Sequence, residues 1–376
     1  MMTPACVPRG FKSNTGHDPG RHARHLYMRR RALIILLVVV GVAAAITAAV
    51  LLRKAAPPEA VRLLPPADGF VYVNFKSLRR AHVFESLPAV QFDPEYDHFV
   101  QQTGFRWEQD LDEAALAMHF APKAQASATG ELQNGTRFSE VFSAHFDAAK
   151  LQAYLKTLAH NVDQYRQVDI YSIPLPGRTL RIAVLGPELV AASNTEGPYV
   201  IQGIIDRSRE LAYPFRGPEL VRSYYRDIPF LSLAWLIAKP PASPQGNSVL
   251  SLPGGYQVFF PPQTTMLGSI RYAGGAQLRL AAYAAGSSEA QRISDQLSAF
   301  LALFRTIESS AAGNDPDVKA FFESVKVEQK KNEVELTASV PQGFLKKVVS
   351  ETPSSPQPAA PPPEPKKPAK PSRKHK

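Results

Sequence analysis

The sequence predicts an α+β fold of largely antiparallel sheets with packed helices, preceded by one transmembrane helix. Three observations lead to this expectation. Residues 32–52 form one apolar run without a charge. After this run, short strand patterns follow one another without helices between them, which is typical of antiparallel sheets. The order strand, strands, long helix, strands, closing helix then occurs twice, in 67–212 and 213–350, so we consider two duplicated subdomains.

The apolar run from Ala32 to Leu52 has the length of a membrane span. A helix rises about 1.5 Å per residue, so the run reaches roughly 30 Å, the thickness of the hydrocarbon core. Secretion signals have a shorter apolar region of about 7–15 residues before a small-residue cleavage site. Small residues near the end of the run keep a cleaved signal as the alternative. We expect a retained, single-pass anchor.

Positive charge on the N-terminal side predicts the orientation of this span. Arg29, Arg30 and Arg31 immediately precede it, whereas basic residues are sparser behind it. By the positive-inside rule the N-terminus is cytoplasmic, and the bulk of the chain lies outside the plasma (inner) membrane. Residues 1–31 form a basic leader without apolar periodicity, and we expect them to be disordered. A translation start at Met28 is a further hypothesis.

Small residues recur every four positions within the span, at Gly41, Ala45 and Ala49. This spacing allows two membrane helices to approach closely. A homodimer formed through the span is therefore one hypothesis. The abundance of alanine in the run gives the same pattern by chance and is the alternative.

The net charge of +10 is concentrated at the two ends of the chain. Residues 1–54 carry +8 and residues 351–376 carry +4, whereas residues 55–350 carry −2. A nearly neutral folded part argues against a nucleic-acid partner. The C-terminal segment is a disordered, Pro/Lys-rich tail that either contacts an anionic envelope polymer or remains solvated.

The motifs of common catalytic and cofactor sites do not occur in the sequence. It contains no glycine-rich phosphate loop, no nucleophile elbow and no HExxH pair. Cys6 is the only cysteine and falls in the leader, so a cysteine zinc cluster is excluded. We therefore expect no cofactor, no metal and no enzymatic activity.

Residues 53–66 are rich in proline and read as a stalk between the span and the first subdomain. In 67–212, alternation, caps and helical spacing predict an order of elements. These are a strand at 70–75, helices at 77–87 and 94–104, strands at 114–120 and 138–146, a helix capped by Asp147, strands at 168–173, 178–185 and 188–193, and a helix opened by Asn194 or Thr195.

The second subdomain, 213–350, is predicted to repeat this arrangement. Its elements are a strand at 230–238, a hairpin of 265–272 with 277–285, a long helix capped by Ser287 or Ser288, a helix at 315–325, strands at 325–331 and 333–340, and a closing helix at 341–350. A Pro- and Gly-rich loop is expected at 238–255, either as a mobile flap or as a long connection.

Two groups of polar side chains were considered as sites. His119 and His145 each precede a phenylalanine at the end of a strand, and pairing of those strands would bring two potential metal ligands together. A polar strand face explains them as simply. The second group is a cluster of acidic residues, and paired carboxylates can serve as general acids and bases. A role in a turn and at the start of a helix explains these residues better. The cluster comprises Glu108, Asp110, Asp112 and Glu113.

Three stretches resemble an uncharacterised family of bacterial single-span envelope proteins: "LPPADGFVYVNFKSLRR" (64–80), "TGFRWEQDLDEAALA" (103–117) and the segment 170–211. The resemblance covers residues 64–230. It implies an N-terminal span and an extracytoplasmic α+β domain that opens with a strand–helix unit, and it carries no catalytic motif.

These observations favour a membrane-anchored, non-enzymatic envelope scaffold or protein-interaction module. Sheet edges and the loop at 238–255 are the expected contact points. The alternative is an extracytoplasmic carrier or sensor for a small apolar ligand or lipid. It rests on the apolar stretch Val258 to Phe260 and on the aromatic set Tyr224, Tyr225 and Trp235.

Overall fold

The fold is known from a computed structural model, which describes residues 56–83, 94–120, 137–210, 217–240, 248–251, 257–272, 275–311 and 315–344. The chain divides into two compact units, Met1–Ala56 and Pro57–Lys376, and the fold below is that of the second. Among the described residues, no helix combines the length and apolar character needed to span a bilayer. The predicted span, leader and tail lie outside them.

The described residues of the first half of the folded unit form seven strands and a series of helices. The strands are β1 (Gly69–Asn74), β2 (Leu111–His119), β3 (Arg137–Ala144), β4 (Asn161–Tyr165), β5 (Val168–Leu175), β6 (Arg178–Val184) and β7 (Leu189–Ser193). The described helices are α2 (Glu59–Leu63), α3 (Phe75–Arg80), α4 (Pro94–Thr103), α5 (Trp107–Asp110), α6 (Ala148–Leu158) and α7 (Tyr199–Arg209).

In the second half, the described residues begin with a short helical segment and continue with strands and two further helices. The described elements are α8 (Glu219–Tyr224), the 3₁₀ turn η2 (Tyr225–Asp227), β8 (Ala234–Ala238), β9 (Ser248–Ser251), β10 (Gln257–Phe260), β11 (Thr265–Tyr272), β12 (Ala276–Tyr283), α9 (Ser287–Ala311), α10 (Pro316–Ser324), β13 (Lys326–Lys330) and β14 (Glu333–Val340). Strands β9 and β10 pair only with each other, so the loop expected at 238–255 includes a strand.

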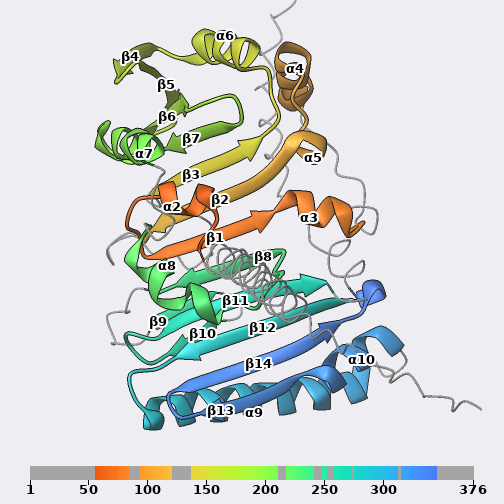
Figure 1. The fold of residues 1–376 in the computed structure, drawn as a ribbon. Coiled ribbons are helices and arrows are strands. Elements are labelled where there is room, and N and C mark those ends of the chain that lie inside the picture. Colours follow the sequence, from red (N-terminus) through yellow and green to blue (C-terminus); the bar gives the residue numbers. More distant parts are fainter. Residues whose placement is uncertain are drawn as a thin grey trace, which may run out of the picture. The chain divides into compact units, whose positions relative to one another are not determined.

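Twelve strands form one sheet in the order β13-β14-β12-β11-β8-β1-β2-β3-β7-β6-β5-β4 (Figure 1). Every neighbouring pair in it is antiparallel. The predicted α+β class with a large antiparallel sheet is thus confirmed. The pairing of β1 with β8 joins the two expected subdomains into this single sheet.

Each half adds its strands to the sheet in a similar sequence. The first strand, β1 or β8, lies at the centre, and β2 and β3 or β11 and β12 extend outward from it. A helix, α6 or α9, then leads to a strand at the outer edge, β4 or β13. The last strand, β7 or β14, returns to pair with the third strand of its half.

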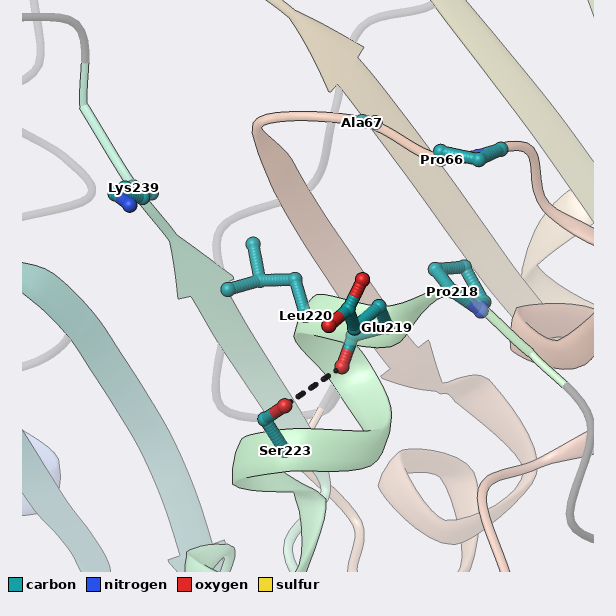
Figure 2. Close-up of a pocket in the computed structure, with 7 residues that line it drawn as sticks. All are labelled: Pro66, Ala67, Pro218, Glu219, Leu220, Ser223 and Lys239. Carbon is teal, nitrogen blue, oxygen red and sulfur yellow. Dashed lines mark hydrogen bonds between the residues drawn. The ribbon is translucent and has the colours of Figure 1, made fainter.

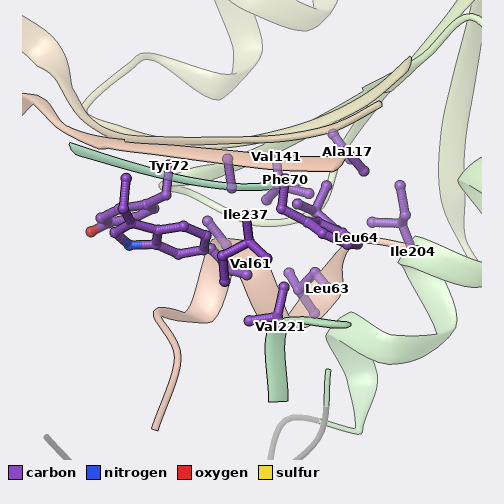
Figure 3. Close-up of a cluster of buried hydrophobic side chains, with 14 of the residues drawn as sticks. Val61, Leu63, Leu64, Phe70, Tyr72, Ala117, Val141, Ile204, Val221 and Ile237 are labelled. Carbon is purple, nitrogen blue, oxygen red and sulfur yellow. The ribbon is translucent and has the colours of Figure 1, made fainter. Parts of the chain in front are cut away.

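The main core lies on the sheet face that carries Phe70 and Tyr72, which we call the first face. Strand alternation places every second residue on this face, where α2, α7 and α8 supply apolar side chains (Figure 3). Val61 of α2, Ile204 of α7 and Val221 of α8 are each 0% exposed. Helix α2, which precedes β1, therefore packs in the same core as α7 and α8, which follow it much later in the chain.

A second, smaller core lies on the opposite face of the sheet, the second face. It is built from Ala282 on β12 and Val334 on β14 against Ala290 and Ile293 of α9. Ala282 alternates with Ala281, which belongs to the main core, so the two cores lie on opposite sides of β12. Ala290 and Ile293 thus attach α9 to this face of the sheet.

The structure differs from the stalk expected at 53–66, because its second half is part of the core. Residues 59–63 form helix α2, and Val61 and Leu63 are only 0% and 1% exposed. The guanidinium of Arg207 on α7 donates from Nε to the carbonyl oxygen of Leu63 at 2.7 Å. This bond satisfies a carbonyl that the end of a helix leaves without a partner. Proline content misled the prediction, since the apolar residues between the prolines are buried.

The helix expected to open at Asn194 or Thr195 begins later, at Tyr199. Both side chains are instead used at the end of the sheet. Asn194 Oδ1 accepts a bond from the backbone N–H of Phe138 at 2.6 Å, and the Thr195 hydroxyl contacts that of Ser193 at 2.9 Å. The Asp147 cap is confirmed, because its carboxylate accepts bonds from the backbone at the start of α6.

Candidate functional site

The two histidines considered as metal ligands lie at opposite ends of a strand pair. His119 ends β2 opposite Arg137, whereas His145 follows β3 beyond Ala144, which lies opposite Leu111. At about 3.4 Å per residue, the pair is separated by roughly 25 Å. Because the strands are antiparallel, the approach that a shared metal site would require does not occur. The described residues also hold no group of three or more metal-binding side chains.

The acidic residues near the start of β2 each have a partner in the fold. Glu108 accepts a bond from the Tyr96 hydroxyl at 2.8 Å, and Asp110 accepts one from the backbone N–H of Arg106 at 2.7 Å. Burial and the bond to Glu108 raise the pKa of Tyr96 to about 12. These carboxylates hold α5 in place, as the turn and helix-start interpretation predicted.

Asp112 is the centre of a cluster that ties α3 to β2. Its carboxylate accepts bonds from Lys76 at 3.0 Å and Arg79 at 2.6 Å, and His145 lies 3.7 Å away. Partial burial opposes ionisation, but the bond and charge of Lys76, with His145 and Arg79, bring the pKa of Asp112 below its usual value. The cluster positions α3 at the end of β1.

Glu113 is the one residue of the acidic group that enters the junction between β1 and β8. Burial raises its pKa, against the effect of a hydrogen bond with Tyr72. Tyr72 stacks on Trp235 with ring centroids 5.4 Å apart, and Tyr225 meets Trp235 edge-on at 5.8 Å. Strand alternation predicts this orientation, because Glu113 is two residues from the buried Ala115 and its side chain points to the same sheet face. A half-buried carboxyl with aromatic neighbours is a candidate ionisable site.

A cavity of about 340 Å³ opens between α8, the segment before β1 and the end of β8. The backbone N–H of Lys239 donates to the carbonyl of Asp68 at 2.7 Å and holds its two strand-end walls together. Ser223 donates to the carbonyl of Glu219 at 3.0 Å, so this hydroxyl is already used (Figure 2). The lining is mainly apolar and consists of Pro66, Ala67, Pro218, Glu219, Leu220, Ser223 and Lys239.

The two aromatic groups behind the carrier hypothesis belong to different cores. Tyr225 and Trp235 pack in the main core on the first face, whereas Phe260 is buried in the second core. Tyr224 contacts Tyr283 at 5.0 Å between centroids. The carrier hypothesis therefore grouped residues that lie in two separate cores of the fold.

A charged surface covers the outer strands of the second half on the first face. Cross-strand register places Arg279, Thr337 and Lys326 in one row, and Glu335 beside Glu328 in the next. Arg279 donates to Glu335 at 2.8 Å and to Glu333 at 3.1 Å. We call this surface the polar sheet face, and it consists of Gln277, Arg279, Lys326, Glu328, Lys330, Glu333, Glu335, Thr337 and Ser339. All of these residues are half-exposed or exposed.

Both edge strands of the sheet are short. β4 exposes polar side chains, and β13 exposes charged ones, Lys326, Glu328 and Lys330. Charged, short edges resist pairing with a further strand. The two sheet edges that the sequence suggested as contact points are thus short and mainly polar.

The residues assigned to the membrane lie outside the described part of the chain. They are Ala32, Gly41, Ala45, Ala49 and Leu52 of the span and Arg29, Arg30 and Arg31 before it. Their roles stay predictions from the sequence.

Comparison with known proteins gives no family for this chain. No family model matches it, and no curated protein matches it. Among solved structures, three crystal forms of TP0453 are similar. Form III has a TM-score of 0.43 at 9% identity and covers 78% of this chain and 98% of that chain. Form I has a TM-score of 0.40 at 11% identity and covers 80% of this chain and 99% of that chain. Form IV has a TM-score of 0.40 at 8% identity and covers 78% of this chain and 97% of that chain.

Proposed function

We propose that the protein is a single-pass envelope protein whose folded unit lies outside the cytoplasm and binds another envelope protein without catalysing a reaction. The observation that carries this proposal is the polar sheet face. Its paired charges are ordered by strand register, and Arg279 is held between Glu333 and Glu335. A preorganised, mixed-charge surface favours recognition of a complementary protein.

The membrane anchor in this proposal is the apolar run 32–52. Residues 53–58 separate it from α2, whose side chains are buried in the main core. The folded unit therefore begins directly after a short linker. The proposed resemblance to single-span envelope proteins fits this arrangement.

We also propose that the two halves arose by duplication. Each central strand is preceded by a helix with a related sequence, "PEAVR" at 58–62 before β1 and "PELVR" at 218–222 before β8. Both helices have an extended proline at the N-cap, with φ, ψ of −52°, 152° and −58°, 141°. Both place a fully buried valine in the main core. The similar strand order of the halves supports the same origin.

Cys6 provides a test of the anchor and its orientation. In right-side-out membrane vesicles, a membrane-impermeant maleimide should leave Cys6 unlabelled until the membrane is opened. A Cys6→Ser, Lys156→Cys variant should be labelled without opening, because Lys156 is exposed on α6. The opposite labelling pattern, or release of the protein by alkaline carbonate, would overturn the proposed topology.

The proposed protein partner is tested by native mass spectrometry of the full-length protein extracted gently from its own membranes. We expect a stoichiometric second protein mass. Lys326→Glu with Lys330→Glu should abolish it, because both lysines are exposed on the polar sheet face. Lys156→Glu with Lys319→Glu makes the same charge change elsewhere and should retain it. A partner that both variants keep would rule out this face.

The carrier function is a second candidate because of the cavity beside α8. Its volume of about 340 Å³ and its prolines and Leu220 suit a small, mainly apolar molecule. The same mass spectra distinguish the two functions. A retained mass of a few hundred daltons would favour a carrier, and Leu220→Trp, which fills the cavity, should remove that mass.

A further inference from the structure

The middle of the second face carries a row of side chains that runs straight across six strands. Strand register places one residue of each strand in this row, from β12 at one end to β3 at the other. We call it the central row, and it consists of Leu280, Gly268, Leu236, Val71, Leu116 and Glu140. Leu280 is 42% exposed, and the other large side chains of the row are half-exposed. The row is therefore only partly covered.

A helix flanks the central row on either side. Helix α9 packs on the second face against β12 and β14, and the second core ends toward β1 at Met266 (Figure 1). The chain passes from β3 through α6 to the parallel strand β4, as it passes from β12 through α9 to β13. Such connections are right-handed in nearly all proteins. Because β3 and β12 run in opposite directions and their connections lead to opposite edges, α6 lies on the same face as α9.

Glu140 is the one charged residue of the central row. Leu116 is its register partner on β2, and Phe138 and Phe142 flank it on β3 at the same face. Burial raises the pKa of this carboxyl, and among the described residues no hydrogen bond or ion pair reaches it. A carboxylate in apolar surroundings destabilises a fold unless a cation pairs with it. Glu140 is therefore a binding position for a cation from outside this part of the chain.

The size of the central row distinguishes a second folded copy from a smaller occupant. Six strands at a spacing of about 4.8 Å extend over roughly 24 Å, and five residues of each strand over about 17 Å. This area of roughly 400 Å² is half of the about 800 Å² per partner that a stable interface between folded proteins buries. A helix of about 16 residues is about 24 Å long and matches it. A second copy would also bring another Glu140 and no cation.

We propose that the central row binds an amphipathic helix of another protein, whose apolar side carries a lysine or arginine that pairs with Glu140. The apolar side chains of this helix pack on Leu236 and Val71, where the two halves of the sheet join. This contact goes beyond the proposed function, which rests on the polar sheet face on the opposite side of the sheet. Substitutions in the polar sheet face therefore leave it unchanged.

The test uses full-length protein in phosphatidylcholine nanodiscs and a dye-labelled amphipathic peptide of about 18 leucine and glutamine residues. One lysine stands at the centre of its leucine side, and a matched peptide has glutamate there. Fluorescence anisotropy, corrected with empty nanodiscs, should show about tenfold tighter binding of the lysine peptide. Glu140→Lys should reverse this preference, and loss of folding cannot produce a reversal.

Leu280→Gln should weaken binding of the lysine peptide about fivefold, because it places an amide in the apolar row. Thr337→Gln is the control and should leave the affinity unchanged, since register places Thr337 beside Arg279 on the opposite face. An unchanged preference for the lysine peptide in Glu140→Lys, or full affinity in Leu280→Gln, would overturn the inference. A dimer mass of the native protein that Leu280→Gln abolishes would overturn it too, because a second copy would then occupy the row.

Discussion

At the scale of single residues, two neighbouring carboxyls on β2 are held in opposite ways. Asp112 faces cations at the protein surface, whereas Glu113 faces the aromatic junction. Their pKa values accordingly move in opposite directions, downward for Asp112 and upward for Glu113. Adjacent positions in a strand point to opposite faces, so one residue step changes the electrostatic environment completely.

Asp112→Asn should lower the free energy of unfolding at pH 7 by about 1–3 kcal/mol, because it weakens charge-assisted bonds to Arg79 and Lys76. The folded pKa of Asp112 is lowered, so its stabilisation exists above the unfolded pKa of about 3.9 and is lost as the pH falls through the folded value. Denaturant unfolding between pH 7 and pH 2 measures this difference. Identical profiles for variant and parent would contradict the assigned cluster.

Glu113→Gln should have the opposite effect. Because the folded pKa of Glu113 is raised, the charged form destabilises the fold, and stability declines as the pH rises from the unfolded value through the folded one. The amide removes that cost and retains a group able to bond with Tyr72. We expect a higher Tm at pH 7 and no difference near pH 3. Glu188→Gln, at an exposed position, is the control and should leave Tm unchanged.

At the scale of elements, α2 is part of the core, whereas the sequence predicted a stalk at 53–66. Leu63→Ala should cost about 2–5 kcal/mol of unfolding free energy, since this side chain is 1% exposed in the main core. Leu303→Ala, at a residue 57% exposed on α9, should change it by less than about 0.5 kcal/mol. Denaturant titration of the full-length protein in detergent compares them. Equal effects would restore the stalk interpretation.

The sequence predicts elements with strong periodicity well and short elements poorly. Strands β2 and β3, the cap of α6 and the start of α10 follow from alternation and capping residues. In contrast, α2, α5 and α8 are too short for a helical repeat to appear. Their positions depend on packing against a sheet whose order only the fold reveals.

The candidate sites show a similar division. The alternation of residues along β2 predicts that Glu113 faces the core. The stacking of Tyr72 on Trp235 cannot be predicted in this way, because the two residues are far apart in the chain. The polar sheet face likewise depends on the register of β12, β14 and β13. No local pattern distinguishes these polar strands from ordinary solvent-facing ones. Whether His119 and His145 could meet depended on strand direction, which the sequence alone does not give.

At the scale of the whole molecule, the continuous sheet predicts that both halves of the folded unit unfold together. Trp107 lies in the first half, and Trp235 lies at the junction of β1 and β8. In a Trp107→Phe variant the fluorescence reports on Trp235 alone. The unfolding transition followed by this fluorescence should coincide with the transition followed by far-ultraviolet circular dichroism. Two separated transitions would instead show that the subdomains fold independently.

The position of α2 also determines how the molecule responds to a mechanical load. A force applied at the N-terminus reaches α2 before any strand, and α2 is held by side-chain packing and the Arg207 bond. β1, in contrast, is zipped to β2 and β8 along its length. Tension therefore detaches α2 first and releases residues 57–68, at most about 40 Å of extended chain. The N-terminal end of the folded unit can therefore lengthen by that distance while the sheet remains whole.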